Sequence, residues 1–211
     1  MINNTVLEKE INTVLKFLQT DLKDCDNLTE ACFPILLTVS SGIDFLGALC
    51  YGFNTFSSKR YPRYINEYMG QIQTTYSNEG FAKYLYNFLR CKISHEACIN
   101  GDFVTKNSDD FIPFHLKYFE EQENYQIYIH PIEFKNDFIG SLNIFLRKFN
   151  ENSGFKNDVL SRYNDRTNEV FNEVEEFRIT YPFGLQRTNL TSWDGTNAPP
   201  KIRLGGSEEE E

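Results

Sequence analysis

The stretch ACFPILLTVSSGIDFLGALCYGF, residues 31–53, decides the fold, because it is apolar on most faces of the helix that it is expected to form. A helix of this kind lies either inside a protein core or across a membrane. The stretch is long enough to span a bilayer, but Asp44 stands at its middle beside two serines and a glycine, and a charge there is costly in lipid. We therefore expect the central helix of a soluble protein.

The sequence around this stretch predicts further helices, in which apolar residues recur every three to four positions. They cover residues 4–22, 61–69, 81–99, 132–149 and 157–177. Between them, FHLKYF at 114–119 and YQIYIH at 125–130 alternate in polarity, which is typical of a β-hairpin. The expected fold class is therefore mainly α, a helical bundle of five to six helices with a small β-hairpin insertion at about 113–130.

Residues 1–178 are expected to form this bundle as one domain, followed by an extended C-terminal tail, 179–211, with an acidic end. The net charge is −9, and Glu208–Glu211 supply four of the negative charges. Such a chain lacks the broad basic surface that holds duplex nucleic acid, although a local basic groove is compatible with it. Five irregularly spaced cysteines and the lack of a signal-peptide pattern after Met1 favour reduced thiols and a cytoplasmic protein of bacterial type.

Arg90 and His95, near the end of the helix predicted at 81–99, are the candidate catalytic pair. Five residues along an α-helix turn through about 140°, so the two side chains do not stack, but the long arginine can reach the histidine. An arginine can bind a phosphodiester through two hydrogen bonds and stabilise charge in the transition state, and a histidine can move a proton at neutral pH. RNA cleavage by its own 2′-hydroxyl needs these two roles and no metal.

The segment LRCKISH, residues 89–95, resembles the R-x4–6-H motif of the HEPN superfamily. A wider pattern, SGIDFLG at 41–47 followed by LRC at 89–91, His95, a hairpin and two helices, is similar to a group of uncharacterised bacterial proteins over roughly residues 30–150. The resemblance implies an all-helical, metal-independent ribonuclease of toxin–antitoxin, CRISPR-associated or anti-phage systems, which acts as a homodimer. It implies that Arg90 binds phosphate and that His95 is catalytic, with Cys91 where the family often has a polar residue.

Four further residues are expected to assist the pair, two as supporting groups and two as RNA contacts: Asp44 and Ser94, then Asn87 and Lys92. A buried Asp44 needs a partner, and Arg90 or His95 is the expected one. That contact would orient a catalytic pair, or it would only neutralise the charge while His95 caps the helix C-terminus. In the second case the protein is a non-catalytic HEPN-like interaction module or a subunit of a defence complex. An open groove shared by Arg90 and His95 would favour the enzyme.

Two other patterns have weaker functional interpretations. Cys91, His95 and Cys98 have a spacing that zinc could use, with His115 and His130 on the predicted hairpin, but a Cys-x2-Cys pair is missing, so we expect no metal and no other cofactor.

Residues 59–65, KRYPRYI, interleave basic and aromatic residues, which suits either stacking on single-stranded bases or an ordinary helix start. The expected partners are RNA, a second copy of the chain and an antitoxin or defence-complex protein, with no membrane.

Overall fold

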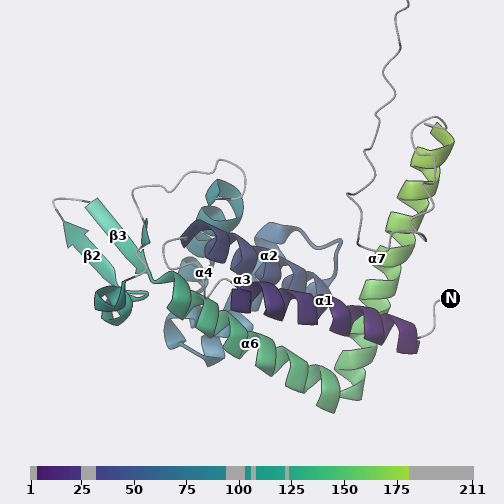
Figure 1. The fold of residues 1–211 in the computed structure, drawn as a ribbon, viewed down its shortest axis with the longest axis horizontal. Helices are drawn as coiled ribbons and strands as arrows, with labels where there is room; N and C mark the ends of the chain where they lie inside the picture. The colour runs from purple at the N-terminus through teal and green to yellow at the C-terminus, as the bar shows by residue number, and fades with distance from the viewer. Residues whose placement is uncertain (1–3, 25–31, 94–102, 106–107, 122–123, 181–211) are drawn as a thin grey trace, which may run out of the picture. The chain divides into compact units, whose positions relative to one another are not determined.

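A computed structural model describes residues 4–24, 32–93, 103–105, 108–121 and 124–180. Helices make up most of these residues, which confirms the expected mainly α fold (Figure 1). The α-helices are α1 (Asn4–Asp24), α2 (Cys32–Tyr51), α3 (Ser57–Glu67), α4 (Glu79–Leu85), α6 (Pro131–Glu151) and α7 (Ser153–Thr180).

The chain divides into two compact units, residues 1–168 and 169–211, and the division falls within α7. The described part of the second unit continues the helix and carries the exposed side chains of Val170 and Phe171. The domain boundary expected after residue 178 stays a prediction. The elements described below belong to the first unit.

Helix α2 is the core helix of the first unit. It contacts α1, α3, α6 and the helical segment that follows α4. Neighbours on several sides explain why the sequence of α2 is apolar on most faces. By length and composition α2 is the one described helix that could cross a membrane, since an 18-residue window within it has a mean hydropathy of 1.7. However, 56% of that window is buried inside the protein. The fully buried apolar side chains of α2 are Ile35, Leu36, Val39, Ile43, Leu46 and Leu49.

Gly42 allows α1, α2 and α6 to approach closely. A Cβ atom at this position would lie 2.6 Å from the ring of Phe138 on α6 and 3.1 Å from Leu18 on α1. Four apolar residues of α6 are fully buried at this contact and further along the helix, namely Phe138, Leu142, Phe145 and Phe149, and Leu146 is partly buried against them.

The N-terminal half of α7 is tied to the core by polar contacts. Arg162 Nη1 donates hydrogen bonds to the carbonyl oxygens of Leu49 at 3.2 Å and Cys50 at 2.7 Å, which have no partner within α2. Lys156 forms an ion pair with Glu8 of α1 at 2.6 Å.

Two segments that were expected to be irregular are helical. The helix predicted at 61–69 begins earlier, because α3 starts at Ser57 and tertiary contacts of its first turn outweigh the weak local signal. The 3-10 helices η2 (Met69–Gln71) and η3 (Thr74–Ser77) occupy most of the polar stretch that follows.

The helix predicted at 81–99 begins slightly earlier and changes its winding. Asn78 caps α4, since its side-chain oxygen accepts a hydrogen bond from the backbone N–H of Phe81 at 3.0 Å. From Tyr86 to Ile93 the chain continues as a π-helix, η4. The rest of the predicted helix, from Ser94, lies outside the described residues. π-helical turns are uncommon and occur often at functional sites.

A small sheet contains the strands β1 (Phe103–Thr105), β2 (Tyr118–Glu121) and β3 (Asn124–Ile129), in the order β1-β3-β2. β2 is antiparallel to β3, with Tyr118 opposite Ile127, and β1 is parallel to β3. Figure 1 shows β3 leading directly into α6.

The first strand predicted for the hairpin, residues 114–119, is wrong over its first half. A 3-10 helix, η5 (Asp109–Phe114), contains Pro113, whose fixed φ suits such a turn. Leu116 then has a φ of 60°, a left-handed conformation that an extended strand does not contain.

Candidate functional site

Asp44 joins three elements through one carboxylate. Its Oδ1 accepts hydrogen bonds from the hydroxyl of Ser57 and from Nε of Arg60, the latter at 2.9 Å. Its Oδ2 accepts a hydrogen bond from Nε of Arg90 at 3.2 Å. We call Asp44, Ser57, Arg60 and Arg90 the arginine cluster. It links α2 to the first turn of α3 and to η4.

The sequence of α2 and α3 explains why these side chains meet. Ser57 and Arg60 are three residues apart, so they lie on one face of the first turn of α3. Gly47 lies about one turn after Asp44 on α2, and a Cβ atom there would stand 3.1 Å from the carbonyl oxygen of Arg60. Gly47 therefore permits the close approach that brings both α3 side chains to the carboxylate.

Arg60 also fixes the turn between α2 and α3. Its Nη1 donates hydrogen bonds to the carbonyl oxygens of Phe53 at 2.8 Å and Thr55 at 3.0 Å. Thr55 in turn donates from its hydroxyl to the carbonyl of Tyr51 and from its backbone N–H to that of Gly52. The same guanidinium thus orders the turn and orients Asp44.

The arginine cluster carries more positive than negative charge. Burial alone would raise the pKa of Asp44, but hydrogen bonds from Arg60 and Ser57 and the charges of Arg60 and Arg90 outweigh it and lower that pKa. Asp44 is therefore ionised at neutral pH. One carboxylate faces two guanidinium groups, and the side chain of Arg90 is 32% exposed whereas those of Arg60 and Asp44 are 15% and 16% exposed. Of the three charged members of the cluster, Arg90 is the one that solvent reaches most easily.

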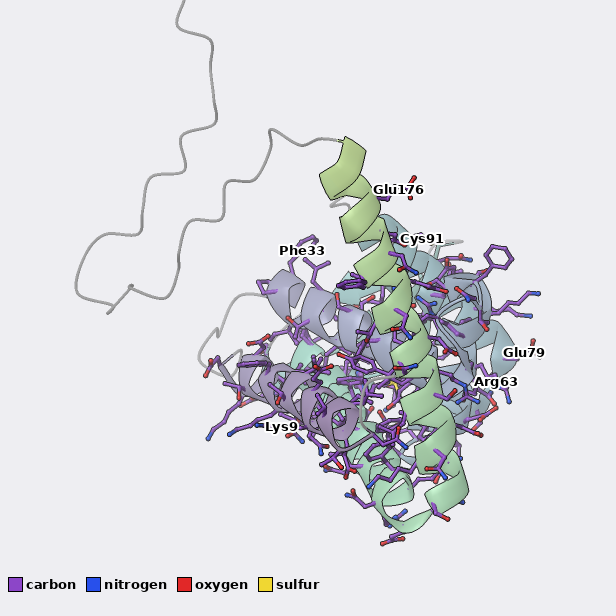
Figure 2. The ribbon with its side chains drawn as sticks, turned by 90° about the vertical axis from the view of Figure 1, so that its right-hand side faces the viewer. Lys9, Phe33, Arg63, Glu79, Cys91 and Glu176 are labelled. Atoms are coloured by element: carbon purple, nitrogen blue, oxygen red, sulfur yellow. The ribbon has the colours of Figure 1, made fainter. Side chains whose placement is uncertain are left out.

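Aromatic and sulfur groups surround the cluster. The rings of Tyr61 and Tyr86 meet edge to face with centroids 5.5 Å apart, and the Tyr61 hydroxyl donates to Oγ of Ser40 at 3.1 Å. Burial, together with a hydrogen bond to Cys91, raises the pKa of Tyr86, and burial also raises that of Tyr61. Both phenols are therefore protonated at neutral pH and do not act as bases. Figure 2 shows Cys91 on the flank of the protein that also carries Arg63 and Glu79.

The expected contact between Asp44 and Arg90 is confirmed, at 3.2 Å. Asn87 is exposed on η4, as an RNA-contacting side chain would have to be, and Lys92 belongs to the same helix, where only its backbone is described. Ser94 and His95 lie outside the described residues, so their contacts with Arg90 and Asp44 stay predictions.

Ser57 and Arg60 were not predicted from the sequence as partners of Asp44. The sequence placed Arg60 only in the basic and aromatic stretch at 59–65, and it predicted no helix before residue 61. The available signal was Gly47, a small residue about one turn from Asp44 on a helix that must accept a neighbour.

A second polar cluster is buried between α6, η3 and the turn after η5. Asp137 Oδ2 accepts hydrogen bonds from the Tyr76 hydroxyl at 2.9 Å and from Nε2 of His115 at 3.2 Å. Nδ1 of His115 accepts a hydrogen bond from the backbone N–H of His130 at 3.1 Å, so the proton of the neutral ring lies on Nε2. We call Tyr76, His115 and Asp137 the histidine network.

The histidine network has the composition of a catalytic site but the bonding of a structural one. Both ring nitrogens of His115 are engaged within the protein, and its side chain is 4% exposed. A general base needs a nitrogen that the substrate can reach. Leu116, with its left-handed backbone, follows His115 directly, so the network holds a strained turn against α6.

The zinc interpretation gains no support in the described part of the chain. Among those residues no group of three or more histidine, cysteine, aspartate or glutamate side chains could hold a metal ion. His115 belongs to the histidine network and His130 caps α6, accepting from the backbone N–H of Glu133 at 3.3 Å. His95 and Cys98 lie outside the described residues.

Comparison of the chain with protein-family models, with curated proteins and with solved structures found no match.

Proposed function

We propose that this protein is a HEPN-like endoribonuclease, a helical bundle of five to six helices with a hairpin insertion, which cleaves RNA without a metal ion. The observation that carries the proposal is the ion pair between Asp44 and Arg90. Arg90 is the arginine of the R-x4–6-H sequence, and a carboxylate from another helix fixes its Nε while the side chain stays about one third exposed. A phosphate-binding arginine needs both a defined orientation and access to solvent.

The charge of the arginine cluster supports an anionic ligand. Both guanidinium groups contact the Asp44 carboxylate, and Arg60, at 15% exposed, is more buried than Arg90 at 32%. A phosphodiester bound at Arg90 would add a negative charge beside two positive ones. Electrostatic stabilisation of this kind is among the largest contributions that a protein makes to phosphoryl chemistry.

In the proposed reaction Arg90 binds a non-bridging oxygen of the phosphodiester and His95 accepts the proton of the adjacent 2′-hydroxyl. The 2′-oxygen bonds to phosphorus and the bond to the 5′-oxygen breaks, which leaves a 2′,3′-cyclic phosphate on one fragment. The 5′-oxygen takes a proton from a second acid, and a homodimer would supply it as the His95 of the other copy. A cytoplasmic role in a toxin–antitoxin or anti-phage system, with an antitoxin or defence-complex partner, belongs to the same proposal.

The alternative function is a non-catalytic HEPN-like interaction module or a subunit of a defence complex. The observation that favours it is that Asp44 uses both carboxylate oxygens in contacts with Ser57, Arg60 and Arg90. Such an arrangement neutralises a half-buried charge and joins three elements without any reaction.

The test is incubation of the pure protein with mixed RNA in EDTA, with Arg90→Ala, His95→Ala and Arg63→Ala assayed beside the wild type. Arg63 is the matched control, because it lies on α3 at 60% side-chain exposure and pairs with Glu67 instead of Asp44. We expect cleavage by the wild type and Arg63→Ala, and a loss of at least 100-fold in rate in the other two.

Cleavage by His95→Ala at the wild-type rate would show a contaminating nuclease. No cleavage by any variant, together with stable binding of a partner protein, would favour the interaction module. The dimer mass of the protein in solution is the companion measurement.

A further inference from the structure

The basic and aromatic stretch at 59–65 does not offer its tyrosines to a ligand. Tyr61 and Tyr64 are both 0% exposed. Their hydroxyls bond to Ser40 and Ser141, and their rings pack inside the core. If this part of α3 contacts a nucleic acid base, another ring must do so.

Phe56 is the exposed aromatic residue at this place. It precedes α3 directly and its side chain is 75% exposed, the largest value among the exposed large apolar residues in the described part of the chain. Single exposed apolar residues are common on protein surfaces, so exposure alone assigns no role. Two further properties distinguish Phe56.

The first property is a fixed backbone. The carbonyl oxygen of Phe56 accepts hydrogen bonds from the backbone N–H groups of Lys59 at 2.8 Å and Arg60 at 3.1 Å. The Arg60 side chain donates hydrogen bonds to the carbonyl oxygens of Phe53 and Thr55, which precede Phe56 in the chain. A ring on a backbone held in this way loses little conformational entropy when it stacks on a ligand.

The second property is its place beside the arginine cluster. Ser57, the next residue, donates to Asp44, and Asp44 holds Arg60 and Arg90. Exposed Lys59 adds a further cation in a chain whose net charge is −9. An exposed ring next to cations is the combination with which proteins bind single-stranded nucleic acids, since the ring stacks on a base and the cations bind the phosphates.

We propose that Phe56 stacks on an unpaired base of single-stranded RNA whose backbone phosphate is bound at Arg90. This inference rests on the proposed function, because it takes RNA as the ligand. It adds a preference for single strands, since the bases of a duplex are covered by their neighbours and cannot stack on Phe56.

The test is fluorescence anisotropy with a short labelled single-stranded RNA in EDTA, using full-length His95→Ala as the parent so that the RNA stays intact. We expect Phe56→Ala to weaken binding roughly 5- to 100-fold and Phe56→Trp to restore it. Phe56→Leu, which keeps an apolar side chain without a π-face, should bind as poorly as Phe56→Ala. The same RNA annealed to its complement should bind the parent weakly.

Phe17→Ala is the matched control, because Phe17 is 64% exposed on α1. Figure 2 shows Lys9 of α1 and Arg63 of α3 on opposite flanks in that view. Phe17→Ala should bind RNA as the parent does. Sedimentation velocity of each variant shows whether the oligomeric state has changed.

Four results would overturn the inference. The first two are Phe56→Ala binding within twofold of the parent and full binding by Phe56→Leu. The third is a shift from dimer to monomer that accounts for the loss, which would make Phe56 a contact between two copies. The fourth is a parent that binds no RNA. Binding that depends on Phe56 without cleavage by the wild-type protein would retain this inference and reject the endoribonuclease.

Discussion

At the scale of single residues, Asp44 is the most consequential side chain in the described structure. A carboxylate in the middle of an apolar helix is costly unless hydrogen bonds and opposite charges compensate it. Ser57, Arg60 and Arg90 do so, and in doing so they bind α3 and η4 to α2. The same contacts that stabilise the fold also orient the arginine of the proposed site.

Asp44→Asn is expected to destabilise the protein by roughly 2 kcal/mol near pH 7, since it removes the carboxylate charge with which both Arg60 and Arg90 pair. The folded-state pKa of Asp44 is lowered, so the unfolded chain binds its proton first as the pH falls. The contribution of ionised Asp44 to the stability of the folded protein is therefore complete above about pH 5, and it is lost as the pH falls below the usual aspartate pKa of about 3.9.

Urea unfolding near pH 7, pH 5 and pH 3.5 measures this dependence. The difference between the wild type and Asp44→Asn should stay constant at the two higher values and shrink at the lowest. Asp110→Asn, which changes an exposed carboxylate on η5, should match the wild type throughout. An Asp44→Asn protein as stable as the wild type near pH 7 would contradict this account of the cluster.

At the scale of secondary-structure elements, side chains outside the residues of each helix complete one end of α2 and one end of α6. Arg162 of α7 binds the last carbonyl groups of α2, and His130 caps α6 with Nδ1 while its backbone N–H binds His115. Capping of this kind satisfies backbone groups that a helix leaves without partners. The His130 cap makes the start of α6 sensitive to pH, because a protonated Nδ1 cannot accept a hydrogen bond.

His130→Asn is expected to reduce the pH dependence of stability in the range where histidine titrates. Burial lowers the pKa of His130 in the folded protein, so the unfolded chain binds the proton more readily. The wild type should therefore lose stability as the pH falls through about 6.5. The His130→Asn protein should lose less, because asparagine is a strong helix cap that does not titrate. Thermal unfolding of both proteins between about pH 7.5 and pH 5.5 compares the slopes. An equal pH dependence of thermal stability in the two proteins would exclude His130 as the cause of that dependence.

A pair of glycine substitutions tests the packing of α2 on α6. Gly42→Ala should cost roughly 1–3 kcal/mol, because the new methyl group would meet the Phe138 ring at 2.6 Å. Gly154→Ala, in the first turn of α7, would meet its nearest neighbour at 3.4 Å and should stabilise the protein by up to about 1 kcal/mol through its higher helix propensity. Chemical denaturation should show a lower free energy of unfolding for Gly42→Ala than for the wild type and a higher one for Gly154→Ala. A Gly42→Ala protein as stable as the wild type would contradict the close approach of the two helices.

The elements differ in how far the sequence could predict them. The helices α1, α6 and α7 follow directly from apolar periodicity, and α2 follows from a long stretch that is apolar on most faces. The need of Asp44 for a partner follows from its place in that apolar helix. The role of Arg60 could not be predicted, because it depends on the approach of α3 that Gly47 permits.

Local patterns also failed where the chain adopts less common structure. The π-helical winding of η4 and the pairing of β1 with β3 have no sequence signal of their own. The stretch at 114–117 alternates like a strand, yet Pro113 and the contacts of His115 with Tyr76 and Asp137 fix a turn there. In each case tertiary contacts decided between local conformations of similar energy.

At the scale of the whole molecule, an acidic chain places a local positive cluster beside an exposed aromatic ring. A net charge of −9 disfavours general attachment to nucleic acid, so RNA binding would be confined to the arginine cluster and Phe56. The RNA affinity would fall as the salt concentration rises, with a shallow slope, because few phosphates are bound there. A protein built in this way would act on single-stranded segments and leave duplex RNA alone.

The central claim is that Arg90 and His95 cleave RNA through its own 2′-hydroxyl. Its most direct test compares a single-stranded RNA with the same sequence carrying 2′-O-methyl groups, in EDTA, with the products analysed by mass spectrometry. The account predicts that the RNA is cut to fragments ending in a 2′,3′-cyclic phosphate, and that the methylated strand binds without being cut. Cleavage of the methylated strand at a similar rate, or an intact RNA after prolonged incubation, would contradict it.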